Sequence, residues 1–304
     1  MDTTRVTEPN IELFSGPGSE APGPELVARP FGATDRGRRR ATNQDQFLVA
    51  TVSGSLWVEQ SSFPQARVRC GGPQAHLFVV ADGLGGHAGG AEASLLAVET
   101  IEAFLLSALG WLDRLEGYDA LVLDELKRAL KRADAAVTAE AKAHPELAAM
   151  GTTLTLACAV EDVLYIAHAG DSRCYLRRSG ALHQLTRDHT IVNELVGAGV
   201  VKEEAAKHHE LRHMVTNALG GGNGSVNAEV HKLRLHADDV VLLCTDGLTE
   251  GVTHERIDAI LASRKDPQLA CERLIAAANE AGGVDNVTAI VTRFDRAEPP
   301  PLHS

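Results

Sequence analysis

The residues best suited to chemistry in this sequence are aspartates placed where apolar segments begin or end. An apolar run stops at Asp82 in HLFVVADGLGGHAGGA, and a cluster of glycines follows. Asp171 and Asp246 also follow apolar runs, whereas Asp45 and Asp285 come shortly before such runs. One such residue would be explained as a turn residue or a helix cap. Five of them, gathered by sheets, would form a cation site.

Aspartates gathered in this way have a restricted chemistry. Carboxylates in a low-dielectric site repel one another, so they either take up protons or hold cations. Oxygen ligands suit hard ions such as Mg²⁺ and Mn²⁺, and the histidine motif H-E-x-x-H of zinc hydrolases does not occur. Two hard ions bridged by one carboxylate would activate water for in-line attack on a phosphate.

A basic run lies just before Asp45 and would supply the cation that a bound phosphate needs. The segment DRGRRRATNQD contains Arg36, Arg38, Arg39 and Arg40. Most of these side chains would form a solvated basic patch. One that points inward would hold a phosphate through paired hydrogen bonds, and the sequence by itself does not say which one.

Two other interpretations of the glycine-rich segment compete with the cation site. Asp-Gly is a common turn pair by itself. Gly83, Gly85 and Ala88 also form G-x-G-x-x-A, the outline of a dinucleotide-binding turn. That fold needs a second parallel strand directly after its first helix, ending at an acidic residue. A second long helical segment follows instead, which disfavours a dinucleotide site.

Composition restricts the class of protein. The chain has 304 residues, of which 44% are hydrophobic, as is typical of globular proteins. A formal net charge of -12 argues against nucleic-acid binding by bulk electrostatics. The five cysteines are scattered without C-x-x-C spacing, which favours reduced, buried thiols in a cytoplasmic protein. No apolar run approaches the roughly 18 residues of a membrane span, and MDTTRVTEPN does not resemble a signal peptide.

The distribution of Pro, Gly and Ser predicts one folded domain between two tails. Residues 1–27 contain SGPGSEAPGPE and are expected to form a flexible Pro/Gly-rich tail. Residues 28–295 would form the domain, and residues 296–304 a disordered C-terminal tail. The insert at residues 55–74 has no recognisable chemistry, so a surface hairpin and a partner site both remain open.

Hydrophobic periodicity predicts two blocks of strands, each followed by two helices. The expected elements are strands over 47–53 and 75–81, helices over 91–106 and 120–143, short strands over 152–186, a polar helix over 189–213, strands over 227–235 and 239–245, helices over 255–263 and 267–281, and a strand over 286–294. This order predicts an α+β fold. We expect a four-layer α-β-β-α sandwich of two mainly antiparallel sheets, each faced by a pair of helices.

Eight short motifs occur between residues 34 and 294, in the order TDRGRRRATNQDQF, VVADGLGGHAGG, GTTLTLA, IAHAGDSRCYL, QLTRDHT, VTNALG, LLCTDGLTE and GGVDNVTAIV. As a set they are highly specific, although each alone is weak. By these motifs the chain resembles the metal-dependent protein serine/threonine phosphatases, the protein phosphatase 2C family, in its bacterial form. The resemblance implies a central β-sandwich flanked by helices on both sides.

The resemblance also implies a metal site that uses Mn²⁺ or Mg²⁺, two ions per site. Asp82 would bridge the two ions, and the carbonyl of Gly83 would bind one of them. Asp246 and Asp285 would complete the coordination of the first ion. Asp45 would hold water near the second. A glycine after Asp82 would leave room for that carbonyl to face an ion and keep side chains out of the phosphate pocket.

Further roles follow from the same resemblance. Asp171 would help to bind a weaker third ion. Arg40, three residues before Asn43, would clamp the substrate phosphate, so that the implied catalytic residues are Arg40, Asp82 and Asp246. Residues 191–213, which we call the flap segment, correspond to a flap over the site where substrate choice is often set.

The chain departs from the family pattern at two positions. The family commonly has Glu where this chain has Gln44, and a neutral amide is a poorer ligand for a hard cation. Related bacterial sequences also have Gln there, so we expect a modest effect on the second ion. Eukaryotic relatives place a His directly after Asp-Gly, whereas His87 comes four residues after Gly83. His87 is therefore either the general acid or a residue that lines the pocket or caps a helix.

These observations predict a protein phosphatase that hydrolyses phosphoserine and phosphothreonine. Its partners would be phosphorylated proteins, among them Ser/Thr kinases and their substrates, with no nucleic acid and no membrane. We expect a cytoplasmic monomer. One alternative is a protein that binds phosphorylated partners without cleaving them, which only Gln44 favours. Another is a stress-response phosphatase that acts on anti-sigma antagonists, but that branch generally lacks the arginine motif present here in GRRRATNQD.

Overall fold

The computed structural model describes residues 26–53, 56–62, 74–85, 87–107, 119–206, 209–222 and 224–297. The predicted tails therefore lie outside the described residues, except for a few positions at their inner ends. Most of the insert at 55–74 also lies outside them. None of the helices in these ranges is both long and apolar enough to cross a membrane.

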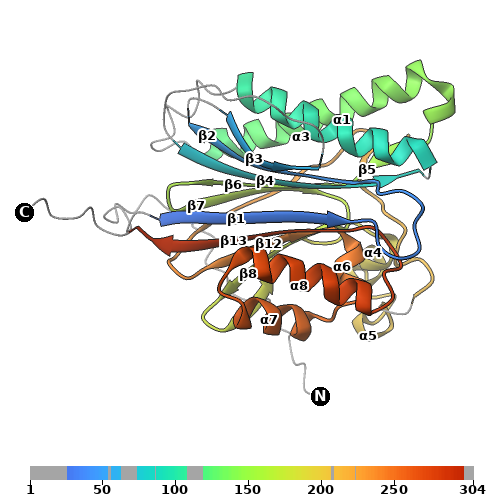
Figure 1. Ribbon diagram of the computed structural model, residues 1–304. Helices are drawn as coiled ribbons and strands as arrows, with labels where there is room; N and C mark the ends of the chain where they lie inside the picture. The colour runs from blue at the N-terminus through green and yellow to red at the C-terminus, as the bar shows by residue number, and fades with distance from the viewer. Residues whose placement is uncertain are drawn as a thin grey trace, which may run out of the picture.

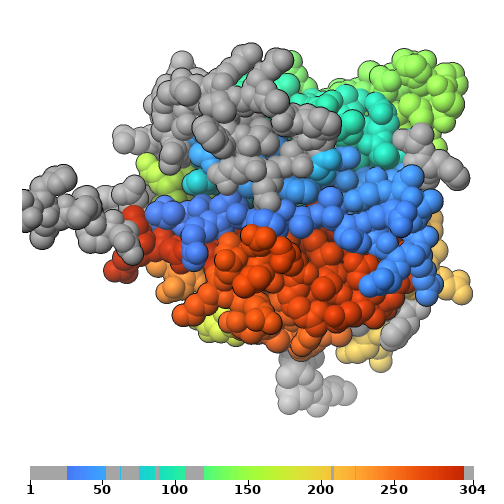
Figure 2. All heavy atoms as spheres, viewed as in Figure 1, coloured from blue at the N-terminus to red at the C-terminus, as the bar shows by residue number. Residues whose placement is uncertain are grey.

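The first sheet contains five antiparallel strands. In spatial order they are β1 (Leu26–Asp35), β13 (Val287–Arg296), β12 (Val240–Cys244), β8 (Arg173–Arg178) and β9 (Ala181–Gln184). The first and last strands of the domain pair along their whole length, with Leu26 opposite Arg296 and Asp35 opposite Val287. Figure 2 shows the result as an N-terminal surface that meets the C-terminal surface along a continuous boundary.

The second sheet contains eight strands, again with antiparallel pairing. They are β2 (Asp45–Ser53), β3 (Leu56–Ser61), β4 (Gln74–Leu84), β5 (Gly151–Thr152), β6 (Leu154–Val160), β7 (Val163–Ala169), β10 (Leu219–Gly220) and β11 (Glu229–Arg234). β4 is central, because it pairs with β2, β5 and β6. β3 forms a hairpin with β2, so the described part of the insert is a hairpin strand.

Two long helices cover the eight-stranded sheet, and two shorter ones cover the five-stranded sheet (Figure 1). The first pair is α1 (His87–Ser107) and α3 (Asp119–Ala143), and the second pair is α7 (His254–Ser263) and α8 (Pro267–Glu280). Leu126, Leu130, Ala133 and Val137 are fully buried on one face of α3, as their spacing predicts. The second pair has side-chain N-caps, from Thr253 on α7 and from Asp266 on α8.

The core is divided into three apolar layers. One lies between α1, α3 and their sheet, one lies between the two sheets, and one lies between the five-stranded sheet and α7 and α8. Tyr165 belongs to the first layer, Phe78 to the second and Leu274 to the third. Three apolar layers require four layers of secondary structure, so the predicted α-β-β-α sandwich is confirmed (Figure 1).

The structure corrects two sequence-based expectations. Strand β1 was not predicted, because Pro30 and Gly32 interrupt an apolar pattern that is half-exposed at the edge of its sheet. The polar segment 189–213 is also not one helix. It contains the short helices α4 (Ile191–Gly197) and α5 (Glu203–Ala206), separated by a turn in which Gly199 has a φ of 72°.

The predicted aspartates lie partly within strands rather than beyond them. Asp45 is the first residue of β2, and Asp82 lies in β4 two residues before its end. Asp246 begins the short helix α6 (Asp246–Thr249) directly after β12. A 3₁₀ turn at Pro145–Leu147 leads into β5. The helices α4, α5 and α6 lie together at one end of the sandwich, on the right in Figure 1.

Candidate metal and phosphate site

Strand register brings the five predicted aspartates to the same end of the sandwich. Asp45 and Asp82 are direct partners in the pairing of β2 with β4. Arg173 pairs with Cys244, so Asp171 and Asp246 extend beyond the same end of the β8–β12 ladder. Asp285 lies two residues before Val287, at the same end of β13. We call Asp45, Asp82, Asp171, Asp246 and Asp285 the carboxylate cluster.

Hydroxyl groups from the opposite sheet orient Asp45. Thr245 Oγ1 and Thr288 Oγ1 donate to Asp45 Oδ2 at 2.8 Å and 2.7 Å. The other carboxylate oxygen, Asp45 Oδ1, is buried and has no hydrogen-bond partner. Thr34 Oγ1 lies 2.7 Å from Thr288 Oγ1, which extends the hydroxyl chain to β1. Asp45 is thus held rigidly with one oxygen left for a ligand.

The main chain of Asp82 is fixed by the motif GTT. Thr153 N–H and Thr152 Oγ1 donate to Asp82 O at 2.9 Å and 2.8 Å, and Asp82 N–H donates to Thr153 Oγ1 at 3.0 Å. Thr153 Oγ1 also lies 2.8 Å from Ser172 Oγ, next to Asp171. Two ligand-type aspartates from distant parts of the chain are therefore coupled through buried hydroxyl groups.

Burial and mutual repulsion raise the pKa values of four aspartates of the cluster, Asp45, Asp82, Asp171 and Asp246. Burial raises the pKa of Asp45 to about 7, although the two hydroxyl hydrogen bonds lower it. Burial likewise raises the pKa of Asp82 well above its ordinary value, and the charge of Asp45 adds to the effect. The pKa values of Asp171 and Asp246 are raised by burial first and by neighbouring aspartates second. A cation would relieve both causes.

Arg40 is the arginine that reaches the cluster. Its Nη2 donates to Asp285 Oδ2 at 2.5 Å, and 51% of its side chain is exposed. This hydrogen bond raises the pKa of Arg40, and the charges of Asp82 and Asp246 raise it further. By contrast, Arg38 Nε donates to Asn279 O on the outer side. Of these two arginines, Arg40 therefore contacts an aspartate of the cluster and Arg38 does not, and Arg40 is the one that the family resemblance names.

The loop that carries Arg40 is shaped by contacts with the segment before β13. Asn286 Nδ2 donates to Arg36 O and to Thr42 O, both at 2.9 Å. Gly37 has a φ of 75°, and a Cβ at this position would lie 2.1 Å from Asp285 O. The backbone of the arginine loop is thus packed directly against the aspartate with which Arg40 pairs.

Gly83 is required by close packing between β4 and the start of α1. A Cβ at Gly83 would lie 2.2 Å from Gly90 O, and a Cβ at Gly90 would lie 2.8 Å from Gly83 O. The same Cβ at Gly90 would lie 2.9 Å from Gln44 Nε2. Gln44 is buried, and its main-chain carbonyl accepts from Ser94 Oγ at 2.6 Å. The residue that departs from the family pattern is therefore part of the packed wall of the site.

The donor set fits hard divalent cations. All five predicted side-chain ligands offer carboxylate oxygens, which Mg²⁺ and Mn²⁺ prefer. Asp246 Oδ1 is buried without a hydrogen-bond partner, as is Asp45 Oδ1. Buried polar atoms in folded proteins rarely lack a partner, and a bound cation would supply one for both oxygens.

Two residues next to the cluster were missed by the sequence analysis. Within the described part of the chain, His213, Asp246 and Glu250 are the one group of three potential ligands whose ligand atoms all lie within 4.8 Å of one another. His213 Nδ1 lies 2.8 Å from Glu250 Oε1. Burial raises the pKa of Glu250 to about 7, and the Asp246 charge adds to it. The sequence signal that could have identified Glu250 is its position four residues after Asp246.

The side chain of His87 lies outside the described part of the structure, so its role stays a prediction.

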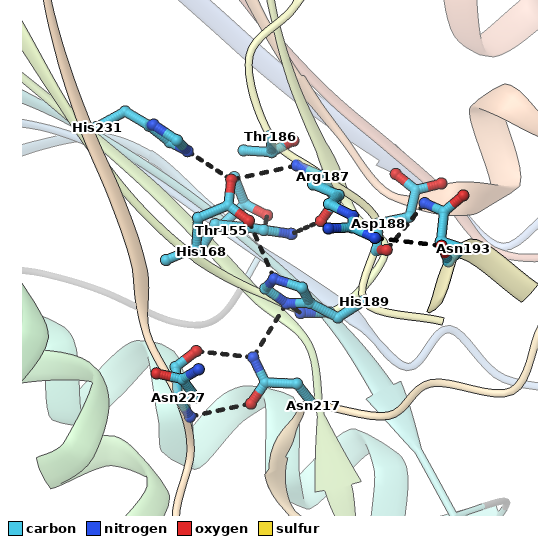
Figure 3. A network of polar contacts seen from close by, with 12 residues as sticks. Thr155, His168, Thr186, Arg187, Asp188, His189, Asn193, Asn217, Asn227 and His231 are labelled. Atoms are coloured by element: carbon cyan, nitrogen blue, oxygen red, sulfur yellow. Dashed lines mark hydrogen bonds and ion pairs between the residues drawn. The ribbon is translucent and has the colours of Figure 1, made fainter. Parts of the chain in front are cut away.

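A second group of polar side chains, drawn in Figure 3, contacts the main chain next to Asp171 of the cluster. His189 is at its centre, and its ring stacks on that of the buried His168 at a centroid distance of 4.8 Å. Gly170 N–H, adjacent to Asp171, donates to His189 Nδ1 at 3.2 Å. We call this group the histidine network; its members are Thr155, His168, His189, Asn217, Glu229 and His231.

Main-chain hydrogen bonds next to the histidine network hold the two ends of the flap segment together. Thr216 N–H donates to His189 O at 2.8 Å, and Ile191 N–H donates to Met214 O at 2.9 Å. Asn217 Nδ2 lies 3.0 Å from His189 Nδ1 (Figure 3). The flap segment therefore begins and ends beside this network.

The chain is similar to known protein phosphatases over most of its length. A sequence profile described as protein phosphatase 2C matches residues 62–277. The chain is 32% identical over 267 residues to the serine/threonine phosphatase stp of Listeria monocytogenes, covering 86% of this chain and 94% of that protein. It is 35% identical to the serine/threonine protein phosphatase PstP of Mycobacterium tuberculosis, covering 88% of this chain but 45% of PstP. A crystal structure of the PstP catalytic domain in complex with two manganese ions matches with a TM-score of 0.67 and 34% identity, covering 89% of this chain and 99% of that one.

Proposed function

The chain belongs to the protein phosphatase 2C family, and we propose that it removes phosphate from phosphoserine and phosphothreonine in proteins. The observation that carries this proposal is the carboxylate cluster, in which buried oxygens of Asp45 and Asp246 have no hydrogen-bond partner. Buried acids of this kind are costly unless a cation is bound. The names of the relatives in Listeria and Mycobacterium support the reaction and the type of substrate.

We propose that the cluster holds two ions of Mn²⁺ or Mg²⁺, as the PstP structure with two manganese ions supports. Asp82 would contact both ions, the Gly83 carbonyl one of them, and Asp246 and Asp285 the first. Asp45 would hold water near the second ion. The bound ions would supply Lewis-acid chemistry, which lowers the pKa of water and neutralises charge on phosphoryl oxygens. A weaker third ion would bind at Asp171.

The side chains of the protein position the substrate around that chemistry. A guanidinium has five N–H donors, and Arg40 uses Nη2 for its bond to Asp285. Because half of the Arg40 side chain is exposed, its remaining donors can turn to the oxygens of a phosphate. The threonine hydroxyls fix the orientation of Asp45, and the GTT backbone fixes Asp82, so little reorganisation is needed when substrate binds.

The experiment that tests this proposal is phosphate release from a phosphothreonine peptide by the purified protein. It is run with Mn²⁺, with Mg²⁺ and with chelator, and in parallel with Asp246→Asn. Asp162→Asn is the matched control, because Asp162 pairs with Arg234 in the turn between β6 and β7, at the opposite end of the sandwich. We expect metal-dependent release that is lost in Asp246→Asn and kept in Asp162→Asn. Phosphopeptide binding without release under either metal would contradict the proposal and favour a phospho-binding protein.

We further propose that the substrates include autophosphorylated Ser/Thr kinases and that the protein acts as a cytoplasmic monomer. Four described cysteines, Cys158, Cys174, Cys244 and Cys271, are free and buried, which suits a reducing compartment. The pairing of Leu26 with Arg296 supports a catalytic domain that extends slightly beyond the predicted 28–295. Dephosphorylation of a kinase activation segment by the purified chain tests the proposed substrates. Sedimentation of the purified chain tests the proposed monomeric state.

A further inference from the structure

The loop between β1 and β2 carries two arginines that the proposed reaction does not use. Arg38 and Arg39 directly precede Arg40, and all three residues are exposed. The loop lies at the end of the sandwich that also holds α4, α5 and α6 (Figure 1). A positively charged surface therefore begins at Arg40, the proposed phosphate clamp, and continues along the chain.

The main chain of both arginines is fixed against the segment that leads to Asp285. Arg38 N–H and Arg39 N–H donate to Gly283 O at 2.8 Å and 3.2 Å. A Cβ at Gly283 would lie 2.8 Å from Arg38 N, so the two segments are in close contact. Because these main-chain positions are fixed, the two guanidinium groups are held near the cluster while they remain accessible from solvent.

Neither guanidinium group contacts a carboxylate in the described part of the chain. Arg38 Nε donates to Asn279 O at 3.2 Å, and the side chain of Arg39 has no hydrogen bond within the same ranges. Asp35 is close in sequence, but its Oδ1 accepts from Gly37 N–H at 2.8 Å and from Asn279 Nδ2 at 3.0 Å. Both arginines therefore keep donors that no acid of the described chain uses.

This lack of acidic partners contrasts with the charge of the whole chain. The sequence has 41 acidic residues and 29 basic ones. Other exposed arginines have found an acidic partner, as Arg29 has in Asp295 and Arg128 has in Glu125. Two neighbouring cations without an anion repel each other, and an anion supplied by another molecule would relieve that repulsion.

The spacing of the loop is similar to that of a bound peptide. Consecutive Cα atoms lie about 3.8 Å apart, so Arg38 and Arg39 begin within roughly 8 Å of Arg40. An extended peptide advances about 3.3 Å per residue. When Arg40 holds the phosphate of a phosphothreonine, substrate side chains one to three residues away are within reach of the two long arginine side chains.

We propose that Arg38 and Arg39 bind an anionic side chain of the substrate, within three residues of the phosphothreonine that is cleaved. A guanidinium group binds both carboxylate and phosphate through paired hydrogen bonds. A second phosphate has about twice the charge of a carboxylate, so it should bind more tightly than Asp or Glu. The inference rests on the proposed function, because it concerns the substrate of the same site.

Phosphate release by the full-length protein with Mn²⁺ tests the proposal on three phosphothreonine peptides. They carry, at one neighbouring position, alanine, glutamate or a phosphonate analogue of phosphothreonine whose phosphorus–carbon bond is not hydrolysed. That position is varied over three residues on either side. At the best position we expect KM to be lower than for alanine by about two- to fivefold with glutamate and by roughly tenfold with the phosphonate. The value of kcat should not change, and the differences should shrink as salt rises to about 0.5 M.

The informative variants are Arg39→Gln and the double variant Arg38→Gln/Arg39→Gln, which remove charge from the surface. We expect the double variant to lose the preference for anionic peptides and to cleave the alanine peptide as the wild type does. Arg264→Gln is the matched control. Arg264 is exposed, and its carbonyl accepts from Arg293 at the end of β13 far from Asp285. This control should keep the full preference.

Equal KM values for the three peptides at every position, with metal-dependent release from each, would overturn the inference and leave the proposed function intact. A preference that the double variant retains would also overturn it, because other groups would then bind the anion.

Failure of the proposed function would be a separate result, seen as no release from the alanine peptide by the wild type. The inference would still be decided by fluorescence anisotropy with peptides that carry a phosphonate in place of the cleaved phosphate. Tighter binding of the peptide with a second phosphonate, lost in the double variant, would support it. Equal binding of the peptides with one and two phosphonates would overturn it.

Discussion

The carboxylate cluster and the histidine network lie side by side, but they differ in whether a buried carboxylate has hydrogen-bond partners that stabilise its charge. In the cluster, burial raises the pKa of Asp45 to about 7, and one of its oxygens has no partner. In the network, burial also disfavours the charge of Glu229. Hydrogen bonds from His189 and His231 nevertheless hold the pKa of Glu229 far below its ordinary value.

The difference separates a binding site from a structural element built of similar residues. A buried polar network in which every group has a partner is rigid and stabilising. A buried group without its partner is costly and indicates a missing ligand. Burial lowers the pKa of His168 to about 4, and Thr155 Oγ1 and Arg187 O each bind one of its two nitrogens, so the ring stays neutral. We therefore propose that the cluster carries out catalysis and that the network is a structural element.

The largest expected effect comes from Asp82→Asn, which should separate the two regions most clearly. Asp82 would contact both ions, so its loss should lower kcat by roughly 10³-fold or more. The variant should stay folded, because removing a repelled charge does not weaken the metal-free protein. Phosphate release and thermal unfolding measure the two effects. Activity within tenfold of the wild type would contradict the assignment of catalysis to the cluster.

Glu229→Gln tests the network with a substitution of similar shape. It should lower the free energy of unfolding at pH 7 by about 2 kcal/mol, because His189 and His231 lose a charged acceptor. A carboxylate with a lowered pKa stabilises the fold above its ordinary pKa, and this is lost as the pH falls. The difference from wild type should therefore shrink below about pH 4. Urea unfolding, with the exposed Glu272→Gln as control, measures it. Equal stabilities at pH 7 would show that the network is not structural.

In chelator, the stability of Asp45→Asn relative to wild type should depend on pH in the opposite sense. The pKa of Asp45 is raised from 3.8 to about 7, so its protonated form is favoured by folding. The contribution of the protonated Asp45 carboxyl to folding stability is fully present below pH 3.8 and is lost as the pH rises through about 7. The metal-free variant should thus be more stable than wild type at pH 8, by about 1–3 kcal/mol, and similar to it at pH 4. Thermal unfolding at both pH values measures this. A variant less stable than wild type at pH 8 would contradict the electrostatic account.

The smallest effect is expected from Gln44→Glu, which adds a carboxylate to the wall of the cluster. Mn²⁺ affinity should rise by about three- to tenfold, because ligand charge tunes the binding of hard cations. In chelator the same substitution should lower the melting temperature, since it buries another negative charge. Mn²⁺ titration and thermal unfolding give both values. Unchanged Mn²⁺ affinity would show that residue 44 acts only in packing.

Much of the fold could be predicted from sequence because its periodicities are local. The helix over 120–143 is confirmed as α3, with Leu126 and Val137 buried on its inner face. The order of strand blocks and helix pairs along the sequence was sufficient to predict the four-layer sandwich. Strand β1 was missed because an edge strand with a proline and a glycine has no clear alternation. Its assignment depends on pairing with β13, more than 250 residues away.

The sequence by itself determined which residue types could form the site, because an aspartate next to an apolar run is a local pattern. It also carried the motifs by which the family is identified. Only the tertiary structure decided which groups meet. Strand register pairs Asp45 with Asp82, and the packing of the arginine loop brings Arg40 against Asp285. Distances between segments far apart in the chain determine which buried oxygen lacks a hydrogen-bond partner. They also determine which histidine of the flap segment contacts Glu250. Hydrogen-bond satisfaction is a property of the packed molecule, so no sequence pattern could reveal it.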